Sequence, residues 1–334
     1  MRTGSIRLFK IFGITVYLHI SWFLILLFEM SSRGHYYSSE IWQFLEIVAL
    51  FGIVLIHEFG HALACRSVGG SADTIILWPF GGFAYVSPPW RPGAMLWSIV
   101  AGPLVNVILI PVTVGIFWVT VAPHIPLTLD SFLRFFPFTW DNLLNFQFSI
   151  PAISGNLGRF LYVLVLMNFI LLIFNLLPVY PLDGGKILWS LLWFVTGEGL
   201  ALRLASVVGL LGSGLLAIFA FKHGQIYMMA LSAFLIFEAV NAYRQSTRLM
   251  MMSKIPRHSQ YRCPNCDQGA RVGAFWTCAN CSTHFDMFAS HGQCPNCHAS
   301  FMNTEIRCPE CRAVSPVSHW FAAATVDPID QPKS

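Results

Sequence analysis

Long apolar stretches constrain this sequence more than any other feature. Backbone N–H and C=O groups in lipid must be bonded within the protein, so a run of about 20 apolar residues crosses a bilayer as a helix. The apolar residues here come in long runs rather than at the period of a strand or an amphipathic helix. Only 11% of the residues are charged, against about 25% in soluble domains. The sequence therefore predicts a protein that crosses a lipid bilayer several times.

Six stretches are long enough to be spans, and two shorter ones interrupt the series. Residues 74–87 are rich in β-formers, which predicts a membrane-associated β-hairpin, and residues 186–195 predict a short helix. The fold class we expect is an all-α polytopic membrane protein with this one hairpin. Transmembrane helices are expected over about 12–29, 42–66, 94–121, 157–177, 200–221 and 225–242.

Basic residues indicate the orientation of these spans. Arg2, Arg7 and Lys10 precede the first span, and several more basic residues follow the last one. Short loops on the cytoplasmic side carry an excess of lysine and arginine. We therefore expect a multi-pass integral membrane protein with both termini in the cytoplasm. The cysteines of the C-terminal region agree with this, because thiols remain reduced there.

The second apolar stretch contains the motif His57-Glu58-Phe59-Gly60-His61. Residues four apart share one face of a helix, so both histidines can bind one metal ion, with Glu58 placed to take a proton from water. Ionisable side chains inside a span cost about 2.5–3.5 kcal/mol each on insertion scales, and a shared metal would give them partners. The motif predicts a catalytic zinc site within a transmembrane helix.

A catalytic zinc ion needs a third protein ligand and an open position. Asp183 is the best candidate, because Pro178 and Pro181 break the chain after the fourth span and Gly184-Gly185 permit a tight re-entry. Broken backbone at membrane depth is tolerated where it lines a buried or wet cavity. Asp183 could instead cap the helix that follows it, and the two roles are compatible.

These motifs resemble the site-2 protease family of intramembrane zinc metalloproteases, in its six-span prokaryotic-type branch. The resemblance covers roughly residues 10–242. It rests on His57-Glu58-x-x-His61, Asn175-x-x-Pro178 followed by Asp183-Gly184, Gly81-Gly82, and Ala101-Gly102-Pro103-x-x-Asn106.

The resemblance implies a site and a reaction. Its substrate would be a membrane-anchored protein, cut within or near its transmembrane segment, and the hairpin would add an unwound substrate strand to its edge. Asn106 would lie along the substrate path or bond between helices. The implied roles are zinc binding by His57, His61 and Asp183, general base catalysis by Glu58, oxyanion or substrate-backbone binding by Asn175, and substrate binding by the hairpin at Gly81 and Gly82.

Eight of the nine cysteines form four C-x-x-C pairs, which resemble the knuckles of tandem zinc ribbons. An interleaved pairing is equally compatible with the spacing. The pairing we expect is sequential, with one structural zinc on Cys263, Cys266, Cys278 and Cys281 and a second on Cys294, Cys297, Cys308 and Cys311.

The composition changes after the last span. We expect a membrane domain over 1–243, a linker over 244–259, a zinc-ribbon domain over 260–320 and a disordered tail over 321–334. Basic and acidic residues alternate in the ribbons, which favours a protein partner over nucleic acid.

The main alternative function is a non-catalytic membrane scaffold or regulator that acts through its zinc ribbons. The intact Glu58 and the complete set of candidate ligands argue against a decayed enzyme. A metal transporter is disfavoured too, because the polar groups gather at one depth instead of lining a path through several spans.

Overall fold

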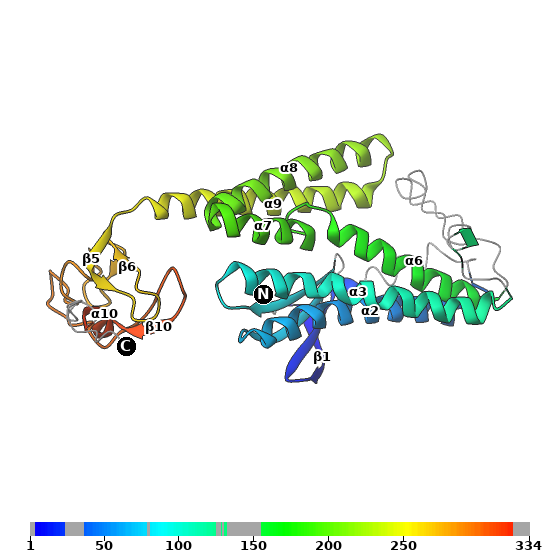
Figure 1. Cartoon of the computed structure of the whole chain (residues 1–334), viewed down its shortest axis with the longest axis horizontal. Coiled ribbons are helices and arrows are strands. Elements are labelled where there is room, and N and C mark those ends of the chain that lie inside the picture. Colours follow the sequence, from blue (N-terminus) through cyan, green and yellow to red (C-terminus); the bar gives the residue numbers. More distant parts are fainter. Residues whose placement is uncertain are drawn as a thin grey trace, which may run out of the picture. The chain divides into compact units, whose positions relative to one another are not determined.

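The computed structural model describes residues 4–23, 37–78, 81–124, 128, 130–131 and 155–322. The chain divides into two compact units, Met1–Ser246 and Thr247–Ser334. The first unit contains the long helices and a small sheet, and the second contains short strands and one short helix (Figure 1).

The long helices confirm most of the predicted spans. The helices are α2 (Glu40–Ser67), α3 (Pro92–Val121), α6 (Asn156–Leu176), α7 (Asp183–Thr196), α8 (Glu198–Lys222) and α9 (Ile226–Ser253). Among the described residues, α2, α3, α6 and α8 are long and apolar enough to cross a membrane, and they match the second to fifth predicted spans. The predicted short helix is α7, which begins at Asp183.

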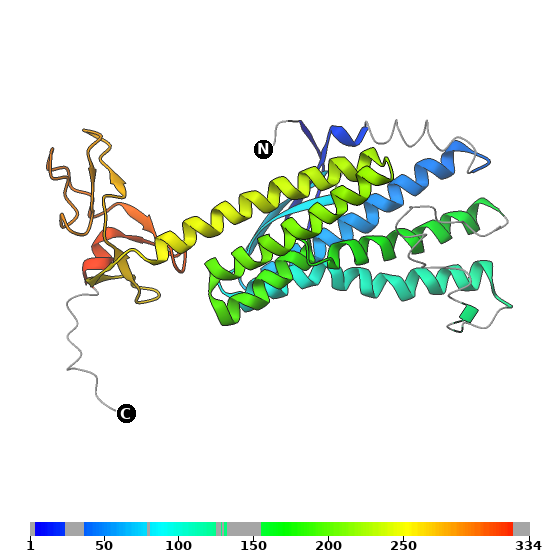
Figure 2. The same ribbon diagram turned by 90° about the horizontal axis from the view of Figure 1, so that it is seen from above.

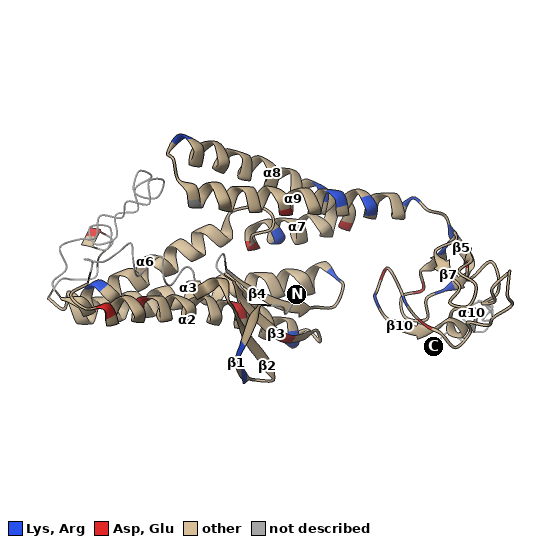
Figure 3. Ribbon diagram, turned by 180° about the vertical axis from the view of Figure 1, so that it is seen from behind, with Lys and Arg blue, Asp and Glu red and all other residues tan. Residues whose placement is uncertain are grey.

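Helices α3 and α8 keep charged residues away from their middle, as a transmembrane helix requires. Helix α3 contains no charged residue, and those of α8 lie in its first two turns and at its last residue (Figure 3). Helices α2 and α3 lie side by side, and α6 packs against both (Figure 2).

The first predicted span is wrong over its N-terminal part. Its residues 14–19 form strand β2 (Ile14–His19), which pairs antiparallel with β1 (Ser5–Ile11) just before the predicted span, through a turn in which Gly13 has a φ of 76°. Burial alternates at the start of β2, where Ile14 and Val16 are buried and Thr15 between them is partly exposed. An apolar run containing such residues has no period that separates strand from helix. Helical backbone is described at 21–23, and the rest of the predicted span lies outside the described residues.

The predicted hairpin is confirmed and belongs to a larger sheet. Strands β3 (Ser71–Trp78) and β4 (Gly81–Ser87) pair antiparallel, and β3 pairs in parallel with β2. The resulting order, β1-β2-β3-β4, leaves β4 at an edge. Buried residues of β2 and β3 form one apolar cluster with α2, which includes Cys65. This packing fixes the sheet against the helix that carries the His-Glu motif.

The second unit begins at Thr247, within helix α9. This helix continues to Ser253, into the stretch 244–259 that was expected to be a linker. Strand β5 (Arg257–Arg262) follows after three residues. The unit contains the pairs β5–β6 (Gly269–Arg271), β7–β8 (Trp276–Thr277 with His284–Phe285) and β9–β10 (Glu305–Arg307 with Val314–Pro316), followed by α10 (Val317–Ala322). Trp320 of α10 is buried in the core of this unit.

A close crossing joins α2 to α3 at Gly60. A Cβ atom added at this position would lie 2.7 Å from the carbonyl oxygen of Ala101 and 2.8 Å from Val105. Backbone cannot move away as a flexible side chain can, so the two helices pack this closely because residue 60 has no side chain.

We expect Gly60→Ala to destabilise the first unit by about 1–3 kcal/mol, because the added methyl overpacks the crossing. Thermal unfolding in detergent would measure the change. Gly52→Ala on the same helix is the matched control, since nothing lies within 4 Å of its Cβ position. It should be neutral or stabilising by up to about 1 kcal/mol. Equal effects of the two substitutions would contradict the steric argument.

Candidate functional site

Two histidines and an aspartate converge between α2 and α7. The Nε2 atoms of His57 and His61 lie 3.1 Å apart, and Asp183 Oδ2 lies 3.0 Å from the first and 3.2 Å from the second. Ligand atoms about 2.0–2.1 Å from a tetrahedral zinc ion are separated by roughly 3.3 Å, so the three atoms fit one such ion. All three side chains are buried.

Asp183 reaches this position because the chain turns sharply after α6. A Cβ atom on Gly184 would lie 2.3 Å from the carbonyl oxygens of Leu176 and Leu177. On Gly185 it would lie 2.3 Å from the amide nitrogen of Tyr180. The two glycines thus allow α7 to start against the end of α6, as the sequence suggested. Asp183 is the first helical residue and the N-cap position is Leu182, so the alternative role of Asp183 as a side-chain cap is not observed.

Hydrogen bonds to acceptors on helix α3 orient both imidazoles. His57 Nδ1 contacts Asn106 Oδ1, and His61 Nδ1 lies 2.8 Å from the carbonyl oxygen of Ser98. A carbonyl or amide oxygen can only accept, so each Nδ1–H donates and each Nε2 presents its lone pair. This tautomer is the one that binds a metal through Nε2.

Asn106 makes the interhelical contact that the sequence offered as one of two roles, and its part in the substrate path stays a prediction. Its side chain is completely buried, and its Nδ2 donates to Asn168 Oδ1 of α6 at 2.7 Å. The interhelical bond that the sequence left open is therefore the contact present in the structure. Sequence reasoning did not identify Asn168, although a buried asparagine in an apolar span is a signal that it needs a partner.

Glu58 lies beside the three candidate ligands and contacts the edge strand. Its Oε2 accepts a hydrogen bond from the backbone N–H of Ala84 in β4 at 3.0 Å. A Cβ atom on Gly82 would lie 2.2 Å from Glu58 Cγ, so this glycine makes room for the carboxylate. Gly81 pairs with Trp78 where the hairpin begins.

A second glycine makes room on the opposite side of the site. A Cβ atom on Gly102 of α3 would lie 2.2 Å from His61 Nε2 and 2.8 Å from His57 Nε2. Any side chain at this position would occupy the space in which the histidine nitrogens meet.

A cavity of about 110 Å³ adjoins the candidate ligands. Glu58, Asn175 and Asp183 line it, together with apolar residues of α6 and α9. Lys186 lines it as well, with its Nζ 4.0 Å from Asp183 Oδ1. The sequence analysis did not single out Lys186, although its place three residues after Asp183 puts both on one face of α7.

The cysteines of the second unit form two groups, but the predicted sequential pairing is wrong. The pairing is nested. The first and last C-x-x-C pairs meet, with Cys263 Sγ 3.7 Å from Cys311 Sγ, while the two middle pairs meet with Cys278 Sγ 3.4 Å from Cys297 Sγ. Sulfur atoms about 2.3 Å from a tetrahedral zinc ion are roughly 3.8 Å apart. The groups are Cys263, Cys266, Cys308 and Cys311, and Cys278, Cys281, Cys294 and Cys297.

All four C-x-x-C pairs adopt the same turn, which explains why the spacing could not reveal the partners. In each, the N–H of the first cysteine bonds to the carbonyl five residues later, and the residue directly after the second cysteine has a positive φ. Those residues are Asp267, Ser282, His298 and Arg312. Side chains that bridge different C-x-x-C pairs then distinguish the nested arrangement.

Glu310, inside the last C-x-x-C pair, is one such side chain. It accepts hydrogen bonds from Arg257 at 2.7 Å and from Arg271 at 2.6 Å. These two arginines lie before and after the first C-x-x-C pair in the sequence. Burial alone would raise the pKa of Glu310, but the two guanidinium groups hold it below its ordinary value. This ion pair ties the last knuckle to the first.

We expect Asn168→Ala to weaken zinc binding at the membrane site by about 10–100-fold, because Asn106 would lose the partner that orients it toward His57. Competition with a calibrated chelator in detergent would give the affinity. Asn156→Ala on the same helix is the control, since Asn156 contacts Ser38 far from the site. A loss of affinity common to both variants would show a general effect on α6.

The nested pairing makes a countable prediction for the ribbons. Cys263→Ser and Cys308→Ser should each remove the same zinc ion, so the double variant should lose one ion from the tail. Cys263→Ser combined with Cys278→Ser should lose two, because closed four-thiolate sites need all their ligands. Zinc counted by atomic emission, after removal of the membrane-site ion by His57→Ala, would decide. Loss of two ions from the Cys263–Cys308 double variant would support separate sites for these residues.

The chain resembles known and putative zinc metalloproteases in sequence. A family model described as peptidase family M50 matches residues 45–219. Zinc metalloprotease MJ0392 of Methanocaldococcus jannaschii is 30% identical over 70% of this chain and 59% of its own length. Putative zinc metalloprotease sll0528 of Synechocystis is 31% identical over 69% of this chain and 55% of its own length. The chain thus spans little more than half the length of these curated relatives.

A solved structure, Site-2 Protease from Methanocaldococcus jannaschii, is 27% identical and has a TM-score of 0.49, covering 72% of this chain and 95% of that one. The family model covers more than half of the chain, and its matched segment includes the His57-Glu58-x-x-His61 motif, Asn106 and Asp183. By this match the chain belongs to peptidase family M50, the site-2 protease family.

Proposed function

We propose that this protein is an intramembrane zinc metalloendopeptidase that hydrolyses peptide bonds in or near the transmembrane segments of membrane-anchored proteins. One observation carries the proposal most directly. Three buried donor atoms from His57, His61 and Asp183 lie 3.0–3.2 Å apart, with the carboxylate of Glu58 beside them. Buried polar groups of this number inside apolar helices call for a common partner.

The donor set fits zinc. Two neutral imidazole nitrogens and one carboxylate leave a fourth position open, which is the composition of catalytic rather than structural zinc sites. Zinc held there would act as a Lewis acid and lower the pKa of a water molecule from about 15.7 toward about 7. The Nδ1 hydrogen bonds of both histidines would keep the ligands in position before substrate arrives.

Glu58 would act as the proton carrier. It lines the same cavity as Asp183, so its carboxylate can take a proton from water in that cavity and return it to the leaving amine. Asn175 lines the cavity from α6 and could donate a hydrogen bond to the oxygen of the scissile carbonyl as negative charge develops there.

Strand β4 supplies a place for the substrate backbone. A transmembrane helix hides its amides in internal hydrogen bonds, so it must unwind before hydrolysis. The free edge of β4 can replace those bonds by adding a strand, and Glu58 lies at this edge. Substrate recognition by Gly81 and Gly82 would then act through the backbone of β4.

The surrounding architecture extends the proposal. We place six spans in the bilayer, with α9 as the sixth and both termini in the cytoplasm, on the charge bias of the sequence. The protein would bind one catalytic zinc ion at the membrane site and two structural zinc ions, one in each nested cysteine group. The ribbons would serve as a binding module, because closed thiolate sites leave no position open for catalysis.

We expect Glu58→Gln to retain zinc at the membrane site and to lower cleavage by about 10²–10⁴-fold, because only the proton carrier is removed. His57→Ala and Asp183→Ala should lose zinc and cleavage together. Purified variants in detergent, incubated with a panel of tagged single-span proteins, would give the cleavage rates, with bound zinc counted in each sample.

The control is His223→Ala, because His223 lies on the exposed turn after α8. It should cleave as the unaltered protein does. Full activity and full zinc occupancy of Asp183→Ala would overturn the assignment of the third ligand. Cleavage that persists in Glu58→Gln would overturn the mechanism.

A further inference from the structure

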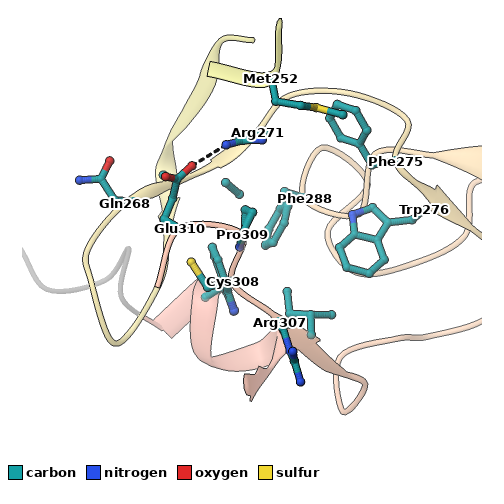
Figure 4. A pocket seen from close by; sticks show the side chains of 14 residues that line it. Met252, Gln268, Arg271, Phe275, Trp276, Phe288, Arg307, Cys308, Pro309 and Glu310 are labelled. Carbon is teal, nitrogen blue, oxygen red and sulfur yellow. Dashed lines mark hydrogen bonds and ion pairs between the residues drawn. The ribbon is translucent and has the colours of Figure 1, made fainter. Parts of the chain in front are cut away.

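The second unit contains a pocket of about 300 Å³ that the two cysteine groups do not explain (Figure 4). Its apolar lining includes Phe288, Ile306 and Trp320, which are buried in the core of this unit. The rings of Phe275 and Trp276 lie together on one side, and Arg271 lies with Glu310 on another. The hollow therefore combines an apolar interior with charge at its margin.

Phe275 gives the pocket an exposed aromatic rim. Phe275 lines the pocket, yet half of its surface remains exposed to solvent. Gly273, with a φ of 151°, permits this placement, because a Cβ atom there would lie 2.8 Å from the phenylalanine ring. Exposed aromatic residues beside an apolar pocket are typical of sites that receive a partner's side chain.

The charges of the pocket are unbalanced toward the positive. One oxygen of Glu310 accepts from both Arg257 and Arg271, so a single carboxylate faces two guanidinium groups. The Nε of Arg271 is buried and has no acceptor among the described residues. Arg307 also lines the pocket, and within the part of the chain that the structure describes it has no ion-pair partner.

We propose that this pocket binds a protein segment in which a large apolar side chain is flanked by carboxylate groups. The apolar side chain would fill the hollow between Phe275 and Phe288, and a flanking carboxylate would pair with the exposed guanidinium of Arg307. A bidentate guanidinium–carboxylate contact at the edge of an apolar anchor supplies both affinity and direction.

The apolar interior distinguishes this partner from other anions. Nucleic acid and lipid headgroups could also pair with arginine, so the experiment includes both as alternative ligands. An acidic peptide without an apolar residue would leave the hollow unfilled. The combination of anchor and charge is therefore the testable content of the proposal, and it does not depend on proteolytic activity.

Fluorescein-labelled short peptides that carry one tryptophan between aspartates would be titrated with the full-length, zinc-loaded protein in detergent, with anisotropy as the readout. We expect saturable binding that weakens at least about tenfold when the aspartates become lysines or the tryptophan becomes alanine. Phe275→Ser and Arg307→Glu should each weaken binding by about tenfold, because both residues lie at the surface of the pocket.

Two variants outside the pocket serve as matched controls. Val314→Ser removes a side chain as exposed as Phe275, and Lys254→Glu reverses an exposed charge of the same unit. Both should bind like the unaltered protein, and the zinc content of all variants should be equal.

Several outcomes would overturn the proposal. They are no saturable binding of the acidic peptides, equal binding of the lysine peptides, and no effect of Phe275→Ser in a protein that retains its zinc. Tighter binding of a single-stranded oligonucleotide or of anionic phosphatidylserine vesicles, lost in Arg307→Glu, would assign the surface to one of those ligands instead.

Discussion

The meeting of two imidazole nitrogens and one carboxylate oxygen is the interaction on which the first unit depends. Polar groups buried among apolar helices are costly unless they share a partner. The neighbouring helices therefore have to position the three side chains against one another. Helix α2 supplies the histidines and α7 supplies Asp183, while α3 contributes the carbonyl of Ser98 and the amide of Asn106. Glycines at the points of closest approach allow the backbones to come near enough. The site is therefore a property of the helix packing as a whole.

The sequence predicted the chemistry of this site better than its support. Spacing of four residues places His57 and His61 on one face whatever surrounds them, and the broken segment before Asp183 is visible in its prolines and glycines. The partners of these residues are set by contacts between helices far apart in the sequence. Asn106 and Asn168 are separated by 62 positions, and no local pattern shows that they bond. The steric role of Gly102, which leaves room for the histidine nitrogens, likewise depends on a contact between distant helices and is not visible in the sequence motif.

Two further differences have physical causes of the same kind. Strand β2 was taken for the start of a span because an apolar run carries no period, and its pairing with β1 and β3 makes it a strand. In the second unit, four identical turns offer eight equivalent thiols, so their spacing fits any pairing. The choice is made by nonlocal contacts such as that of Glu310 with Arg257 and Arg271. Local geometry was thus predictable wherever a short motif determines it, and unpredictable wherever a distant neighbour does.

The hydrogen bond between the Ala84 N–H and Glu58 has a thermodynamic consequence. That N–H is one of the donors at the free edge of β4, and while it bonds the carboxylate it is not available to another acceptor. A strand added to this part of the edge would compete with Glu58 for the same donor. The two equilibria are linked and reciprocal: whatever favours strand addition there disfavours the carboxylate contact by the same factor. Occupation of the edge and release of the carboxylate are then two sides of one coupling free energy.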